Sequence, residues 1–196
     1  MYNKHHLLCF EIMYELKDLK TDSLILRPLS LEYSEDYQKH FDDYRIIRYL
    51  STDVPWPYPK NAAYEFIKNI ILPDQGIGRF TYGIFLKEQS NELIGCIDLW
   101  RTPKPENRGF WLAHKHWSKG YMTQACGAIN RLAFEELDFD CLYFSNAVGN
   151  KASSKVKQKT GAELLGLMDA NFIDPTFGSA ELWMLTKSQW QSFSNS

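Results

Sequence analysis

A short apolar run, a polar loop and an amphipathic helix follow one another between residues 109 and 137, and this segment constrains the fold more than any other. From Thr123 to Leu137, apolar residues recur at the 3.6-residue spacing of a helix with one buried face. The run from Gly109 to Ala113 has the composition of a strand. The intervening loop, His116 to Thr123, therefore leads a strand into a helix N-terminus. Such a junction directs unpaired N–H groups and the positive end of the helix dipole to one spot, which predicts an anion site suited to a pyrophosphate.

Gly120 stands just before this helix, where two interpretations are open. A residue without Cβ lets a phosphate approach the backbone closely, and it also lets a loop adopt a positive φ. A lone glycine before a helix is more often a structural turn than a ligand cradle. The loop lacks the patterns G-x-x-x-x-G-K-[ST] and G-x-G-x-x-G, which disfavours nucleotide-binding folds of those kinds.

The rest of the chain alternates between strand-like and helix-like segments, which predicts an α/β (α+β) layer architecture. The predicted strands are 23–27, 80–87, 93–100, 109–113, 142–147, 162–167 and 180–186, and the predicted helical segments are 34–48, 61–71, 123–137 and 152–160. No repeat or linker divides the chain. We expect an N-terminal tail at residues 1–12 and a single domain at residues 13–196.

Composition excludes several other classes of protein. The formal net charge is −2, which argues against a protein that grips nucleic-acid phosphates. No apolar stretch approaches the roughly 20 residues needed to span a bilayer. The four cysteines have no metal-like spacing, and Cys96, Cys126 and Cys141 sit in apolar stretches. We therefore expect buried free thiols, no metal site, no membrane or nucleic-acid partner, and a reducing cytoplasmic location.

Two blocks in the right order resemble a known family. The run 109–113, followed by Trp117-Ser118-Lys119-Gly120-Tyr121-Met122-Thr123-Gln124-Ala125, resembles motif A of the GNAT acetyltransferases. It is closest to the branch of the RimJ/RimL-type ribosomal-protein N-terminal acetyltransferases. That branch later carries the pattern N-x-A-S-x-x-V-x-x-K-x-G, matched here by Asn150, Ala152, Ser153, Val156, Lys159 and Gly161. Trp117 and Met122 depart from the ends of the general motif Q/R-x-x-G-x-G/A, where backbone amides do the binding.

The resemblance implies a GNAT fold, with a central mixed, mostly antiparallel, twisted sheet of about seven strands flanked by helices. It also implies acetyl-CoA as co-substrate. The residues expected to bind it are Leu112, Ala113, Trp117, Ser118, Lys119, Gly120, Tyr121, Met122, Thr123, Asn150, Ser153 and Lys155. Lys155 is the first choice for the ribose 3′-phosphate, against a solvated helix face. Asn150 is expected on the pantetheine, against an ordinary helix N-cap.

The family's chemistry is direct attack of an amine on the thioester, without an acyl-enzyme. A backbone N–H near Leu112 or Ala113 is expected to polarise the carbonyl. Many family members protonate the thiolate with a tyrosine whose position is Lys157 here, so Ser153 is the better candidate, with helix capping as its alternative. For the base, Glu106 and Glu181 rank above Asp98.

Other groups in the chain bear on proton transfer and on the acceptor. His114 and His116 follow the strand and could relay protons through water. The acceptor side is expected within Tyr33–Gly78. Its acids, which are Asp42, Asp43, Asp53 and Asp74, leave a polycation acceptor open.

The acceptor amine is the least constrained prediction. An α-amino group has a pKa of about 7.7–8.0 against about 10.4 for lysine, so a protein N-terminus suits an enzyme without an obvious base. A small-molecule amine such as an aminoglycoside, polyamine or amino acid is the alternative acceptor. A non-catalytic CoA-binding module is a further alternative. It is favoured because Lys157 replaces the family's tyrosine and because Asn107, with Glu106 beside it, stands where the family often has a glutamate. A monomer and a homodimer are both compatible with the sequence.

Overall fold

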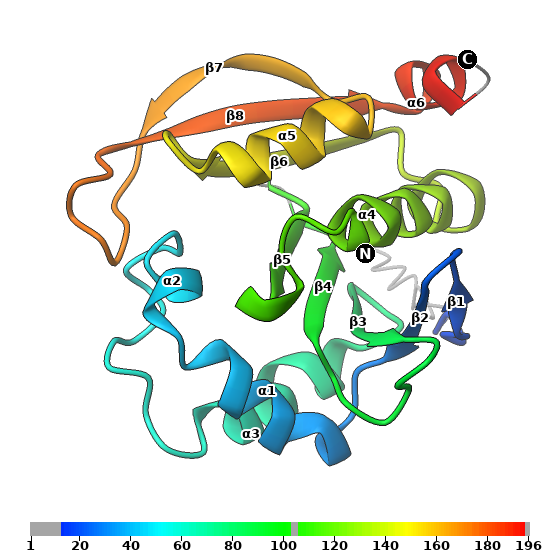
Figure 1. The fold of residues 1–196 in the computed structure, drawn as a ribbon. Helices are drawn as coiled ribbons and strands as arrows, with labels where there is room; N and C mark the ends of the chain where they lie inside the picture. Colours follow the sequence, from blue (N-terminus) through cyan, green and yellow to red (C-terminus); the bar gives the residue numbers. More distant parts are fainter. Residues whose placement is uncertain (1–12, 103–105, 195–196) are drawn as a thin grey trace, which may run out of the picture.

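The computed structural model describes residues 13–102 and 106–194, which form two antiparallel sheets with helices around them (Figure 1). The first sheet has the strand order β1-β2-β3-β4-β5 and the second the order β6-β8-β7. The strands are β1 (Leu19–Lys20), β2 (Leu24–Pro28), β3 (Arg79–Leu86), β4 (Gly95–Trp100), β5 (Arg108–Leu112), β6 (Cys141–Ala147), β7 (Glu163–Asp169) and β8 (Ser179–Thr186). The predicted α/β (α+β) class is confirmed. The tail predicted at residues 1–12 lies outside the described residues.

The helices before α6 lie close to their predicted places. They are α1 (Ser34–Phe41), α2 (Tyr44–Ile47), α3 (Ala62–Phe66), α4 (Tyr121–Arg131), α5 (Lys151–Lys159) and α6 (Lys187–Ser194). Both α3 and α4 continue into a π-helical turn, at Ile67–Ile71 and Leu132–Glu136 respectively. The sequence did not predict β1 or α6. β1 has only two residues, and α6 buries no residue fully, so neither carries a strong hydrophobic period.

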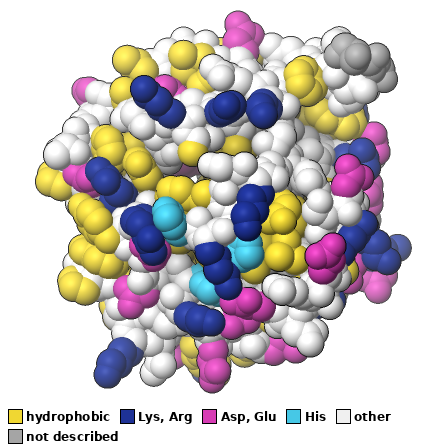
Figure 2. Space-filling view, in the orientation of Figure 1, with side chains coloured by type: hydrophobic (Ala, Val, Ile, Leu, Met, Phe, Trp, Pro, Cys, Tyr) yellow, Lys and Arg dark blue, Asp and Glu magenta, His cyan; other side chains and the backbone are white. Residues whose placement is uncertain are grey.

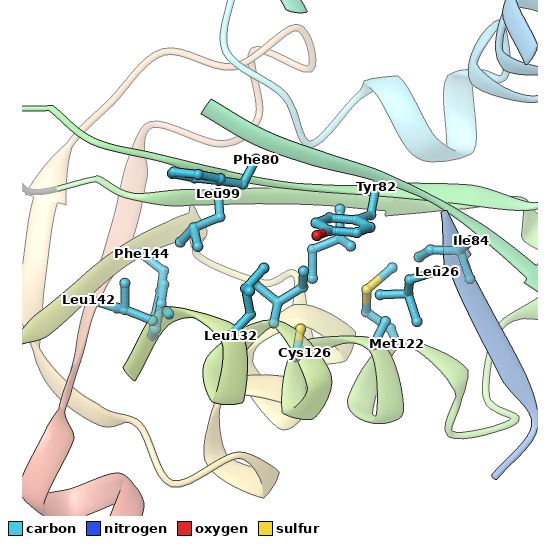
Figure 3. Packing of buried hydrophobic residues seen from close by; sticks show 14 of the residues in the cluster. Leu26, Phe80, Tyr82, Ile84, Leu99, Met122, Cys126, Leu132, Leu142 and Phe144 are labelled. Atoms are coloured by element: carbon cyan, nitrogen blue, oxygen red, sulfur yellow. The ribbon is translucent and has the colours of Figure 1, made fainter. Parts of the chain in front are cut away.

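Helix α4 packs its apolar face on the first sheet. Met122 and Cys126 of α4, with Leu132 of its π-helical continuation, point toward side chains of β2, β3 and β4 (Figure 3). Each large side chain fully buried in this way stabilises the fold by about 1.5–3 kcal/mol. The periodic face read from the sequence is thus the face that α4 buries, and this packing fixes where its N-terminus lies.

A second apolar cluster covers the opposite face of the first sheet. Tyr37 and Phe41 of α1 contact Trp111 of β5 edge to face, with ring centroids 4.8 Å and 5.4 Å apart. Ala63 and Ile67, from α3 and its extension, complete the cluster with side chains of β3 and β4. The first sheet is therefore the middle layer between α4 and the α1–α3 group.

The expectation of one central mixed sheet is wrong in detail, because the described strands form two sheets and every strand pair is antiparallel. Asn107 joins the two sheets. Its N–H donates to the Tyr143 carbonyl at 2.8 Å, and its side-chain Oδ1 accepts from the Tyr143 N–H at 2.9 Å. Its Nδ2 also donates to the Trp100 carbonyl at 3.2 Å. Beyond this junction β5 and β6 share no ladder, so a gap opens between them.

Other expectations concern thiols, metals and membranes. Cys96 and Cys126 are buried free thiols as predicted, whereas Cys141 is only partly buried. In residues 13–102 and 106–194, no cluster of His, Cys, Asp and Glu side chains is arranged to hold a metal ion. Over the same residues, no helix has the length and apolarity to cross a membrane.

Candidate active site

A cavity of about 780 Å³ occupies the gap between β5 and β6. Its walls come from β5, from the loop 116–123, from α5 and from β6. Tyr49, Asp53, Asn171 and Phe172 line its other end. Figure 2 shows lysine and arginine side chains spread over this face of the molecule, with histidines among them near its middle. Eleven of the twelve residues predicted to bind acetyl-CoA line this cavity, and Ala113 is the exception.

The loop before α4 has the backbone shape of an anion cradle. Ser118 and Gly120 both have positive φ, at 62° and 79°. Gly120 is the N-cap of α4 and provides no side-chain cap, so the first N–H groups of the helix have no partner within it. A Cβ built on Gly120 would meet nothing within 4 Å. Its left-handed φ therefore favours glycine, and the space in front of it is open to a ligand.

Trp117 anchors this loop to β5. Its indole Nε1 donates to the Leu112 carbonyl at 2.6 Å, and its ring lies 4.9 Å from that of His114. The side chain also packs against both apolar clusters. Tryptophan at the first motif position thus acts by holding the loop against the strand.

The amide groups of β5 alternate between β4 and the cavity. Ala113 donates its N–H to the Ile94 carbonyl at 2.8 Å. Because hydrogen-bonded pairs alternate along an antiparallel ladder, Phe110 and Leu112 direct their N–H groups away from β4, toward the gap. Of the two donors expected for the carbonyl, Ala113 is occupied in the ladder and Leu112 faces the cavity.

Helix α5 carries both exposed and buried polar groups. Asn150 caps it, because its side-chain Oδ1 accepts from the Ser153 N–H at 3.2 Å. Lys151, Lys155 and Lys159 are exposed, and the last two reach the cavity wall. The N-cap alternative for Asn150 is therefore observed, and Asn150 also lines the cavity.

Lys157 differs from its neighbours because its side chain is turned inward and only 1% exposed. Its Nζ donates to Ser153 Oγ and to Asn146 Oδ1, each at 2.7 Å. Burial, with the nearby Arg108 cation, lowers the pKa of Lys157 to about 7. The sequence placed Lys157 at the family's tyrosine position, but nothing in the hydrophobic pattern indicated that it is buried.

The two glutamates predicted as bases have different surroundings. Glu106 is exposed on the cavity wall, and its Oε1 accepts from Ser145 Oγ at 2.8 Å. Glu181 is not part of the cavity wall. Its Oε2 accepts from Ser154 Oγ at 2.6 Å, and from Asn146 Nδ2 and Trp183 Nε1 at 3.1 Å each. Although burial raises the pKa of Glu181, these three hydrogen bonds outweigh it and hold the pKa below its ordinary value. A carboxylate so engaged is better suited to orient Asn146 than to take a proton.

Of the remaining candidates for proton transfer, one lines the cavity and two do not. Asp98, the rival base, is held by Arg79 at 2.6 Å and by Thr81 Oγ1 at 2.6 Å, and it does not line the cavity. His116 is 7% exposed on the cavity wall. Burial and the neighbouring lysines lower its pKa, so its imidazole is neutral at physiological pH. His114 contacts Arg45 Nη1 at 3.2 Å and lies off the cavity.

Two loops meet at the part of the cavity where the sequence predicts the acceptor side. The segment after α2 pairs with the β7–β8 loop through an isolated bridge between Ser51 and Phe172. The Ile173 N–H also donates to the Leu50 carbonyl at 3.0 Å. Of the four acceptor-side aspartates that the sequence suggested, only Asp53 lines the cavity.

Comparisons with known proteins agree with this architecture. The model of the acetyltransferase (GNAT) domain family matches residues 23–163. A protein of Bacillus subtilis (strain 168), whose name proposes a ribosomal N-acetyltransferase (YdaF), is 30% identical over 103 residues. That match covers 50% of this chain and 56% of the relative, so the chain matches little more than half the length of this curated relative.

Solved structures support the fold. A GNAT-family acetyltransferase from Bacillus anthracis superposes with a TM-score of 0.73 at 16% identity, over 88% of this chain and 99% of that chain. The RimL acetyltransferase of the ribosomal L7/L12 α-N-protein, in complex with coenzyme A, superposes with a TM-score of 0.73 at 17% identity, over 87% of this chain and 98% of that chain. The predicted GNAT fold and its likeness to the RimJ/RimL branch are confirmed.

Proposed function

Because the chain belongs to the acetyltransferase (GNAT) domain family, we propose that it transfers an acetyl group from acetyl-CoA to a primary amine. The favoured acceptor is the α-amine of a protein N-terminus. The observation that carries the proposal is the gap between β5 and β6, which opens beside an uncapped helix N-terminus.

The residues present fit acetyl-CoA. The free N–H groups at the start of α4 suit a pyrophosphate, and the open space in front of Gly120 lets it approach them. The side chains of Lys119 and Lys155 are exposed on the same cavity wall and suit the outlying phosphate. The β5 amides that face the gap offer backbone hydrogen bonds to an extended pantetheine arm.

The chain's own groups supply positioning and proton transfer. Acetyl-CoA supplies an acetyl thioester with a good leaving group. In this proposal the Leu112 N–H, which is directed away from β4 toward the gap, stabilises negative charge on the acetyl oxygen. Of the three acids considered as the base, which are Glu106, Glu181 and Asp98, Glu106 lines the cavity and can take the proton of the attacking amine. Ser153 presents its hydroxyl to the cavity and can protonate the sulfur.

Two considerations favour an α-amine acceptor. Among the described residues, Asp53 and Glu106 are the carboxylates on the cavity wall, which suits an amine that arrives as a cation. The α-amine titrates near neutral pH, so a weak base such as Glu106 is sufficient to help it lose its proton. The names of YdaF and RimL refer to ribosomal acceptors, which makes a ribosomal protein N-terminus the first acceptor to test.

The test is acetylation of paired peptides followed by mass spectrometry. One peptide has a free α-amine and no lysine, and its partner has a blocked N-terminus and one lysine. We expect acetyl transfer to the first peptide at least about tenfold faster near pH 7, because more of its amine is neutral. Equal or faster modification of the second peptide contradicts an α-amine acceptor. No transfer to peptides or small amines, despite acetyl-CoA binding, indicates a non-catalytic module.

A further inference from the structure

Lys157 is the most deeply buried cationic side chain among the residues that line the cavity. The proposed acetyl transfer gives it no role. Its side chain is 1% exposed, whereas every other lysine in the described ranges is at least partly exposed. A buried ammonium is costly unless it is hydrogen-bonded and paired with an opposite charge. The surroundings of Nζ therefore need an explanation.

A chain of hydrogen bonds runs through Nζ to the cavity wall. Glu181 accepts from Asn146 Nδ2 at 3.1 Å, which turns Asn146 Oδ1 toward Lys157. Nζ donates to that oxygen and to Ser153 Oγ, at 2.7 Å each. The Phe110 ring lies 5.6 Å from Nζ and covers it from β5. Lys157 is thus held from β6, from β5 and from its own helix.

Charged groups face Lys157 from several elements. The Arg108 cation of β5 disfavours the ammonium, whereas the carboxylates of Glu181 on β8 and of Glu106 favour it. The Cys126 thiol of α4 also faces Lys157, but burial raises its pKa and keeps it neutral. Burial is the largest effect, and the net result is a pKa of about 7. Lys157 can therefore exchange its proton near physiological pH, which an exposed lysine does not do.

The Ser153 hydroxyl is set between Lys157 and the cavity. The Ser153 N–H is engaged by Asn150, and Oγ accepts from Nζ. Within the described part of the chain, no atom accepts a hydrogen bond from the Ser153 hydroxyl. Because Ser153 lines the cavity, this proton is free to point at a ligand.

We propose that Lys157 is a positioning residue that orients the Ser153 hydroxyl and replaces the proton which Ser153 gives to the leaving sulfur. This inference rests on the proposed acetyl transfer. The ammonium of the acceptor first loses one proton to solvent, which leaves a neutral amine. As the C–N bond forms and the C–S bond breaks, the second amine proton passes to Glu106. The Ser153 hydroxyl proton passes to sulfur, and a proton of Lys157 Nζ passes to Ser153 Oγ. The neutral Nζ then accepts from Ser153 while still donating to Asn146, and solvent restores both Glu106 and Lys157 after CoA leaves.

The first test is the ionisation of Lys157 itself, which does not depend on turnover. The side-chain carbons of ¹³C-labelled lysine are followed by NMR against pH, and Lys157 is assigned by its loss in Lys157→Met. We expect one lysine to titrate near pH 7 in the wild-type protein. A Lys157 that stays protonated to pH 9 or above overturns the inference.

The second test measures the chemical step in single turnovers across pH. We expect Lys157→Met and Lys157→Arg each to slow acetyl transfer about 100-fold at pH 6.5, because neither replacement can give Ser153 a proton. Binding of acetyl-CoA is expected to change little.

The pH dependence gives a separate readout. The single-turnover rate of the wild-type protein, plotted against pH, should bend downward as Lys157 deprotonates, and this bend should vanish in both variants. Ser153→Ala combined with Lys157→Met should be no slower than either change alone, since the two residues act in one relay.

Lys151→Met is the matched control, because Lys151 is an exposed lysine on the same helix and lies off the cavity. It should leave the rate and its pH dependence unchanged. Thermal unfolding of each variant shows whether it folds. An active wild-type protein whose folded Lys157 variants keep the rate and the bend overturns this inference alone. A wild-type protein that acetylates no amine overturns the proposed function, and the inference with it.

Discussion

The two ends of the cavity are built differently. The end beside α4 and α5 is made of backbone amides, a left-handed glycine and exposed lysines, all within two continuous stretches of sequence. The acceptor end is made where the segment after α2 meets the β7–β8 loop, more than a hundred residues away in the chain. Local geometry determines the first end and long-range pairing determines the second. The donor end is therefore readable from sequence, and the acceptor end is not.

The largest effect is expected at the donor end, from Gly120→Val. The left-handed φ of Gly120 disfavours any side chain, and the added carbons would stand in the space open to a phosphate. We expect the dissociation constant for acetyl-CoA to rise about 100-fold, or about 2.7 kcal/mol. Isothermal titration calorimetry measures this directly.

Gly149→Val is its control, because Gly149 also has a positive φ, at 97°, and a Cβ there would meet only the Phe177 ring at 3.5 Å. This variant should lose comparable stability and keep its affinity. Similar affinities for the two valine variants would show that the donor end is not built on Gly120.

The next effect compares the two glutamates. Glu106→Gln should lower kcat/KM about 10- to 100-fold below pH 8, since it removes the cavity-wall carboxylate proposed as the base. Its unfolding temperature should stay unchanged, because Glu106 is exposed. Glu181→Gln should lower the unfolding temperature but change kcat/KM below pH 8 much less, because Glu181 orients Asn146 and Ser154. The reverse pattern in steady-state kinetics would assign the base to Glu181.

A third prediction concerns stability against pH. The pKa of Lys157 is about 7 in the folded protein and 10.5 in an ordinary lysine, so between these values the unfolded chain binds more protons. The free energy of unfolding of the wild-type protein should therefore rise with pH across this window, and Lys157→Met should lack that contribution. Urea unfolding at pH 6.5 and 9.5 should show Lys157→Met gaining about 2–4 kcal/mol relative to wild type at the lower pH. A difference between the two proteins that does not change with pH is inconsistent with a depressed pKa.

The smallest effect is expected at the acceptor end. Asp53→Asn removes an exposed carboxylate, and exposed charge interactions contribute about 1 kcal/mol or less. We expect KM for a peptide acceptor to rise about two- to fivefold, while KM for acetyl-CoA stays constant. Added salt should produce a similar loss in the wild-type protein and little in the variant. An equal change in both KM values would mean that Asp53 does not distinguish the two ends.

Much of the fold followed from the sequence because its signals are local. The periodic face of α4 and the alternating strands were read from neighbouring residues, and packing then placed them as expected. The separation into two sheets depends on the hydrogen bonds of Asn107 to Tyr143, which no local pattern indicates.

The site was predicted unevenly for the same reason. The loop 117–123 was identified because backbone shape follows from glycine and helix position. Lys157 was missed because the buried side of α5 also presents Ser153 and Thr160, so a hydrophobic period does not reveal it. Its burial became evident only once Asn146 of β6 lay beside it.

The most direct test of the central claim is the thermal unfolding midpoint with and without acetyl-CoA. At about 100 times its dissociation constant, a ligand that binds only the folded state adds about 2.7 kcal/mol. In a domain of this size, the midpoint should then rise by roughly 5–10 °C. At the same acetyl-CoA concentration the rise should shrink to about 1–2 °C in Gly120→Val, because the ligand is then only at about its dissociation constant. The rise should be fully present in Gly149→Val. No rise in the wild-type protein at millimolar acetyl-CoA would contradict a donor site between β5 and β6.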